Sequence, residues 1–135
     1  MIVLDCSAAV NMVNKTVEGD ALQSLILPNE KTIASDLFFI EAASAVGKYI
    51  KTGAFSEKEA LERLLDIVDS VDEFIPIKEN YIEAFHESIR LQHSVYDMLY
   101  FTLARRYGAT LLTLDAKLLK LCEEQGIDCV HKVSF

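Results

Sequence analysis

Short apolar segments alternate with longer helix-forming segments along the chain, and this alternation constrains the fold more than any other feature. The strand-like segments are residues 2–4, 31–34, 74–77, 110–114 and 127–131. The segments with helical apolar spacing, caps and breakers are residues 7–13, 18–27, 36–51, 56–71, 79–92, 94–107 and 116–125. Short buried strands that alternate with helices form parallel sheets covered by helices on both faces. We therefore expect an α/β fold, an α/β/α sandwich with a mainly parallel sheet of four or five strands.

The size and composition of the chain are those of one globular domain. Its 135 residues, 51% apolar and 25% charged, are enough to bury a continuous core. Because no repeat, low-complexity tract or Pro/Gly-rich linker divides them, we expect a single domain over residues 1–135. No apolar run approaches the roughly 20 residues of a membrane helix, so we expect no membrane association. The first residues, MIVLDCS, lack the basic region of a signal peptide, and Cys6, Cys122 and Cys129 lack paired spacing, so we expect a cytoplasmic protein with reduced thiols.

The charge balance limits the kinds of partner. Lys+Arg 13 against Asp+Glu 21 gives a formal net charge of −8. Broad electrostatic binding to nucleic acid or to an anionic membrane depends on clustered lysine and arginine, so this composition argues against it. A local basic patch remains open, and a bound cation would change the local balance.

Two acids follow strands of the expected sheet. Asp5, in "LDCSAAV", ends the first strand, and Asp115, in "LLTLDAKLL", ends the fourth. In open parallel sheets the ligand crevice lies beyond the carboxyl ends of the strands, so both acids share that edge. Each acid also precedes a helix, and aspartate is a favoured N-cap, so a purely structural role stays open for both.

Two further acids lie on helix faces that are expected to point inward. Asp97, in "HSVYDMLYFTLA", shares its face with Tyr100, Phe101 and Ala104, although Ser94 and Asp97 also fit a capping box. Glu41, in "LFFIEAASAV", is flanked on its face by apolar and small residues. Burying an unpaired carboxylate is costly, so Glu41 requires a partner, a metal ion or a proton.

Taken together, the four acids predict a metal site. Clustered carboxylates repel one another and raise one another's pKa values, and a hard divalent cation removes that penalty. An all-oxygen ligand set suits Mg²⁺ or Mn²⁺. We therefore expect Asp5, Glu41, Asp97 and Asp115 to form a pocket that binds one or two such ions.

With "VLDCSA", "EAASAV", "YDMLYFTLA" and "LLTLDAKL" in this order, the chain resembles a PIN domain, particularly the VapC-type toxin ribonucleases. The resemblance extends over essentially the whole chain. It implies a metal-dependent endoribonuclease that cuts single-stranded RNA or a structured RNA loop and is the toxin of a toxin–antitoxin pair. It also implies a homodimer, silenced by a small antitoxin whose basic segment enters the acidic pocket.

The resemblance also implies roles for individual residues. Asp5 and Asp97 are the principal metal ligands, Asp115 completes or supports a second metal position, and Glu41 binds metal or orients a bound water. Ser7 and Thr113 match the small hydroxyl residues that such proteins often carry beside the first and last acids. The chain departs from the family pattern in two places: Ser35-Asp36 stands where a proline usually precedes the second motif, and Met98 replaces a small residue. Neither departure removes a carboxylate.

The expected mechanism is in-line attack on a phosphodiester by a metal-bound hydroxide. Lys48 and Lys117 are candidate contacts for the substrate phosphate, although ordinary surface lysines are the commoner explanation. His93 could act as a base or phosphate contact, or be an ordinary loop histidine.

Other families with acidic sheet-end sites fit less well. A response-regulator receiver needs an acid after the third strand, and "FIPIKEN" has none there. A Rossmann unit needs a glycine-rich turn, which "DCSAAV" lacks, and a haloacid-dehalogenase-type phosphatase needs D-x-D. The alternative that remains is a non-catalytic PIN-like binding or scaffold module.

Overall fold

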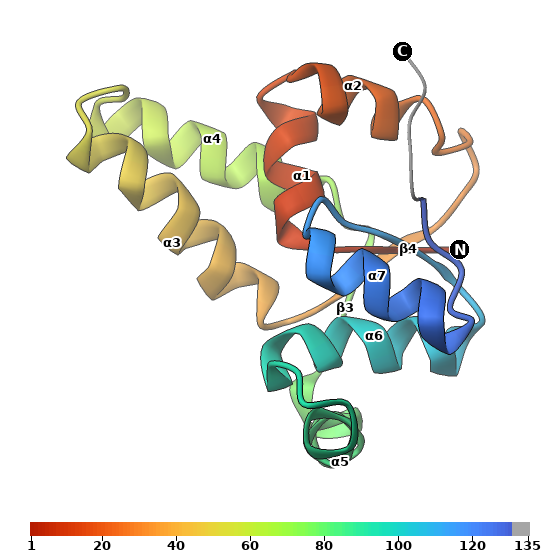
Figure 1. Ribbon diagram of the computed structural model, residues 1–135. Helices are drawn as coiled ribbons and strands as arrows, with labels where there is room; N and C mark the ends of the chain where they lie inside the picture. The colour runs from red at the N-terminus through yellow and green to blue at the C-terminus, as the bar shows by residue number, and fades with distance from the viewer. Residues whose placement is uncertain (131–135) are drawn as a thin grey trace.

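The computed structural model describes residues 1–130 and contains a four-stranded, all-parallel sheet (Figure 1). The strands are β1 (Ile2–Leu4), β2 (Thr32–Ser35), β3 (Glu73–Ile75) and β4 (Thr110–Leu112), in the order β3-β2-β1-β4. β1 is central and pairs with β2 on one side and with β4 on the other. The α/β prediction with a parallel sheet is confirmed.

Seven α-helices flank this sheet in the part of the chain that the structure describes. They are α1 (Cys6–Val13), α2 (Val17–Gln23), α3 (Phe38–Lys51), α4 (Glu57–Asp69), α5 (Tyr81–Leu91), α6 (Val95–Tyr107) and α7 (Ala116–Gln125). In Figure 1, α3 and α4 form an antiparallel pair that extends away from the sheet, and α5 lies outside α6. Within residues 1–130, none of the helices is both long enough and apolar enough to cross a membrane.

Helix α6 is the part of the core that bears most directly on the site. It packs on β1, β2 and β4, and its residues 98–104 are all buried. A helix that is apolar all round is stable only inside a core, and here α5 covers the face of α6 that the sheet leaves open. The position of α6 relative to the sheet is therefore set by packing on two sides.

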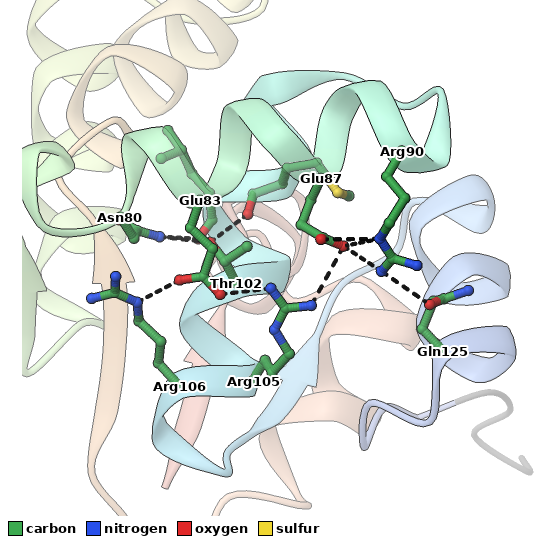
Figure 2. Close-up of polar contacts among 10 residues, drawn as sticks. Asn80, Glu83, Glu87, Arg90, Thr102, Arg105, Arg106 and Gln125 are labelled. Atoms are coloured by element: carbon green, nitrogen blue, oxygen red, sulfur yellow. Dashed lines mark hydrogen bonds and ion pairs between the residues drawn. The ribbon is translucent and has the colours of Figure 1, made fainter.

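Polar contacts fix α5 on α6 (Figure 2). The buried side-chain amide of Asn80 donates to the Leu99 carbonyl oxygen at 3.0 Å and to Thr102 Oγ1 at 2.8 Å. Glu83 bridges Arg105 and Arg106, with each N–O distance 2.6 Å. Exposed ion pairs contribute only about 0.2–1 kcal/mol each, so they orient the helix pair more than they stabilise it.

Several predicted boundaries are wrong. The fourth strand, expected over residues 110–114, ends at Leu112, so Thr113 and not Asp115 directly follows it. The other differences have local reasons. The helix expected over residues 18–27 ends at Gln23, where Leu25 and Leu27 are exposed and Pro28 disfavours helical geometry in the residue before it. The third strand ends at Ile75 because Pro76 has no N–H to donate, and a 3-10 turn (Ile77–Glu79) follows. The predicted fifth strand, residues 127–131, is reduced to an isolated bridge between Cys129 and Leu111, and His131 lies outside the described residues.

Candidate active site

The strand order reverses direction beside β1. The chain first adds β2 and β3 on one side of β1 and then crosses the sheet to place β4 on the other side. In open α/β sheets, ligands bind outside the carboxyl ends of the strands at this switch point. Asp5 directly follows β1, and Thr113 directly follows β4, so both residues lie at the switch.

The main donors to the Asp5 side chain are hydroxyl groups, with a smaller contribution from the backbone N–H of Cys6 at the start of α1. Asp5 is the N-cap residue of α1, but its side chain makes no capping hydrogen bond. Its Oδ2 instead accepts from Thr113 Oγ1 at 2.6 Å and from Ser7 Oγ at 2.9 Å, and the residue is only 6% exposed. Burial raises the pKa of Asp5, and the hydrogen bonds from Thr113 and Ser7 oppose that rise. A capping role therefore does not explain why an acid stands here.

Ser7 and Thr113 also join the end of β4 to the start of α1. Ser7 Oγ accepts from the Leu114 N–H at 3.0 Å, and Thr113 Oγ1 accepts from the Asp115 N–H at 3.0 Å. The two hydroxyl oxygens are 3.2 Å apart. The structure therefore brings together both hydroxyl residues that the sequence singled out, and gives them a shared acceptor in Asp5.

Asp97 lies in the first turn of α6 and contacts His93. His93 Nε2 is 2.9 Å from Asp97 Oδ2, and the Ser94 hydroxyl accepts from the Tyr96 N–H instead of completing a capping box with Asp97. Burial raises the pKa of Asp97, His93 opposes the rise, and the charge of Asp115 adds to it.

Glu41 lies in the first turn of α3 and is part-buried. Its Oε1 accepts a hydrogen bond from the Tyr100 hydroxyl at 2.5 Å. Burial raises the pKa of Glu41 to about 7, against the effect of the Tyr100 hydrogen bond and with added repulsion from Asp5 and Asp97. The partner that a buried glutamate requires is thus a phenol.

Asp115 has the helix-capping role that its position before a helix suggested. It is the N-cap of α7, and its Oδ1 accepts from the backbone N–H groups of Lys117 at 2.9 Å and Leu118 at 3.1 Å. Its charge nevertheless acts on Asp97, so it lies near the other acids.

The four carboxylates converge without forming a ready-made ligand set. Repulsion links Asp5 to Asp97, Glu41 to both, and Asp97 to Asp115. Within residues 1–130, however, no three His, Cys, Asp or Glu side chains lie close enough together to hold a metal ion. Like-charged groups do not close on one another unaided, and their oxygens are the ligands that Mg²⁺ or Mn²⁺ prefers. The donor chemistry fits such a cation, and the side chains would have to move inward to bind it.

The two candidate lysines lie on the surface. Lys48 is exposed near the far end of α3, about 10 Å along the helix axis from Glu41. Lys117 is also exposed, in the first turn of α7. Neither ammonium group forms an ion pair with the described residues, so their contact with a phosphate stays a prediction.

Sequence reasoning missed two contacts at the site. The helical spacing places Tyr100 on the inward face that it shares with Asp97, in the core or a dimer interface, but does not predict that its hydroxyl reaches Glu41. His93 was left between a loop residue and a functional one; its spacing of four residues from Asp97 is the signal that points to their contact.

An apolar pocket lies between α5 and the start of α6, and no carboxylate is among the described residues that line it. It has a volume of about 420 Å³, and its lining includes Tyr81, Phe85, Tyr96 and Leu99. Three large aromatic side chains around the pocket are about half exposed: Tyr81 at 49%, Phe85 at 53% and Tyr96 at 60%. Exposed apolar groups gathered in one patch often mark an interaction surface.

Comparison with known proteins identifies the family. The PIN domain family model matches residues 2–124. Ribonuclease VapC12 of Mycobacterium tuberculosis is 30% identical over 118 residues, which are 87% of this chain and 89% of the relative.

Solved structures show the same fold. The crystal structure of PAE2754 from Pyrobaculum aerophilum superposes with a TM-score of 0.71 at 22% identity, covering 88% of this chain and 84% of the other. VapBC-1 from nontypeable Haemophilus influenzae superposes with a TM-score of 0.60 at 16% identity, covering 96% and 97%. Together with the acids at the sheet switch, the family match shows that the chain belongs to the PIN domain family, among its VapC-type ribonucleases.

Proposed function

We propose that the chain is a divalent-metal-dependent endoribonuclease and the toxin of a toxin–antitoxin pair, acting in the cytoplasm as a single PIN domain. The observation that carries the proposal is the state of Asp5. It is a buried acid at the sheet switch, it makes no helix cap, and neutral hydroxyl donors hold it beside Asp97 and Glu41. Its family relative is named a ribonuclease.

Each acid has a distinct part in the proposed reaction. Asp5 and Asp97 hold the Mg²⁺ or Mn²⁺ ion, and Asp115 supports a second position through the carboxylate oxygen that the α7 cap does not use. When bound there, a divalent ion would supply a water of lowered pKa and would stabilise charge on the phosphate. Glu41, whose pKa is raised by burial to about 7, would bind the metal ion or orient a water beside it. Lys48 and Lys117 are the candidates for aligning the RNA backbone.

Two protein partners belong to the proposal. A small antitoxin with a basic segment would complement the four acids of the site, and one of the solved structures that share this fold is that of VapBC-1. A second copy of this chain would cover the exposed apolar side chains of α5 and α6 around the pocket, since patches of this kind mark interfaces.

One observation favours a non-catalytic binding or scaffold module instead. The described residues contain no group of three acids, histidines or cysteines arranged for a metal ion. In that case the carboxylates would keep their present protein partners. Added Mn²⁺ would not change the stability of the protein and would not lead to cleavage of RNA.

The deciding experiment compares growth on induced expression of the wild type, Asp5→Ala and the control Asp66→Ala, whose side chain is exposed on α4. We expect growth arrest by the wild type and Asp66→Ala but not by Asp5→Ala. In vitro, the purified wild type should cut single-stranded RNA only with Mn²⁺ or Mg²⁺, and Asp97→Asn should not. Equal growth of all strains together with no metal-dependent cleavage would exclude the toxin ribonuclease.

A further inference from the structure

The contact between Tyr100 and Glu41 joins two helices at the site. Tyr100 lies on α6, one turn after Asp97, and Glu41 lies in the first turn of α3. The hydrogen bond spans 59 positions of sequence and is 2.5 Å long. The helix that carries Asp97 thus also carries the donor that holds Glu41.

We infer that Tyr100 is a positioning residue, which holds the Glu41 carboxylate in place for a divalent cation without neutralising its charge. This inference rests on the proposed function. Nothing in the sequence pattern of the acids requires a tyrosine at this position.

Burial makes the geometry of Tyr100 rigid. Its side chain is fully buried, at 0% exposure, and α6 is packed between the sheet and α5. A glutamate side chain has three rotatable bonds, and a carboxylate with a fixed donor loses much of that freedom in advance of binding. Among the described residues, the hydrogen bond to the Glu41 carboxylate falls on Oε1, and Oε2 remains for another ligand.

The chemical nature of the donor matters as much as its position. A tyrosine hydroxyl donates its proton in the neutral form, so this contact places no positive charge beside Glu41. A lysine or arginine at this place would cancel the negative charge of Glu41 and compete with a cation. Within residues 1–130, Glu41 forms no ion pair with a basic side chain. Asp5 is held in the same way by neutral hydroxyl groups, those of Thr113 and Ser7.

The test measures Mn²⁺ binding by isothermal titration calorimetry to the full chain after removal of metal. Tyr100→Phe deletes the donor and keeps the ring. Loss of a group that orients a metal ligand typically weakens metal affinity by roughly 10–100-fold, and we expect a loss in this range. Tyr96→Phe, on the same helix but 60% exposed, is the matched control and should bind as the wild type does.

A double-mutant comparison assigns the effect to Glu41. Glu41→Gln should weaken Mn²⁺ binding, and adding Tyr100→Phe should weaken it little further. Glu41→Asp keeps the charge but withdraws the carboxylate by one methylene, so its loss of Mn²⁺ affinity should resemble that of Tyr100→Phe. It therefore tests the same contact if Tyr100→Phe folds poorly. In RNA cleavage, Tyr100→Phe should raise the Mn²⁺ concentration for half-maximal rate and leave kcat at saturating Mn²⁺ near that of the wild type.

Several results would overturn the inference. Wild-type affinity in both Tyr100→Phe and Glu41→Asp would show that the hydrogen bond does not position a ligand. Fully additive losses in the double variant would show that Tyr100 acts independently of Glu41. A wild type that binds no Mn²⁺ would overturn the proposed function along with the inference. If Glu41→Gln weakens Mn²⁺ binding but Tyr100→Phe does not, the inference alone is overturned.

Discussion

Removing the charge of Glu41 should stabilise the metal-free protein at neutral and alkaline pH. Burial raises the pKa of Glu41 from 4.5 to about 7, so the folded state disfavours the ionised carboxylate. Glu41→Gln removes this cost and keeps an oxygen that can accept from Tyr100. The prediction is counterintuitive for a site residue, because most substitutions of part-buried residues destabilise a protein.

The size and sign of the effect follow from linkage. Below pH 4.5 the carboxyl is protonated in both folded and unfolded states, and the wild type loses nothing. As the pH rises, the unfolded state ionises first, so folding stability falls until the folded carboxyl also ionises near pH 7. At about 1.4 kcal/mol per pH unit the full rise corresponds to about 3 kcal/mol, and partial solvent screening reduces this to about 1–2 kcal/mol. That difference corresponds to about 3–6 °C in the unfolding temperature.

Thermal unfolding in EDTA from pH 4 to pH 8.5 measures this effect. The unfolding temperature of Glu41→Gln should equal that of the wild type near pH 4 and exceed it increasingly up to pH 7–8. Glu62→Gln, at an exposed position on α4, should show no such divergence. A constant difference at every pH, or a less stable Glu41→Gln at pH 8, would refute the assignment of Glu41 as a buried acid of raised pKa.

Three further substitutions test other contacts. Thr113→Val removes the donor to Asp5 and should lower the free energy of unfolding by about 1.5–3 kcal/mol in urea titrations; an unchanged midpoint would contradict this bond. Asp115→Ala should cost about 1 kcal/mol through loss of the α7 cap, whereas Asp115→Asn should cost little, and equal losses in thermal unfolding would argue against capping. Glu83→Gln should cost less than about 1 kcal/mol, and 1 M salt should remove the difference if the ion pairs to α6 are its cause.

Two of the acids show which side-chain contacts a local sequence pattern can predict. Asp5 and Asp115 look alike in sequence, since each follows an apolar, strand-forming segment and precedes a helix. Asp115 caps its helix and Asp5 does not. The difference is the Thr113 hydroxyl, which reaches Asp5 from 108 positions away, and no local pattern contains that information.

Residues on α6 give the same lesson for the core. The inward face of Tyr100, Phe101 and Ala104 was predictable from helical spacing, and all three are buried. The hydrogen bond from the Tyr100 hydroxyl to the Glu41 carboxylate was not predictable, because it depends on where α3 lies relative to α6.

By itself the sequence determined the order of the helices and of the first four strands, the apolar faces that build the core, and the positions of the four acids near strand ends and helix starts. These features depend on periodicity, capping and turn chemistry within a few residues. Only the tertiary structure decided the order β3-β2-β1-β4 and the partner of each carboxylate. Those features depend on contacts between segments tens of residues apart, and such contacts exist only once the sheet and its helices have packed together.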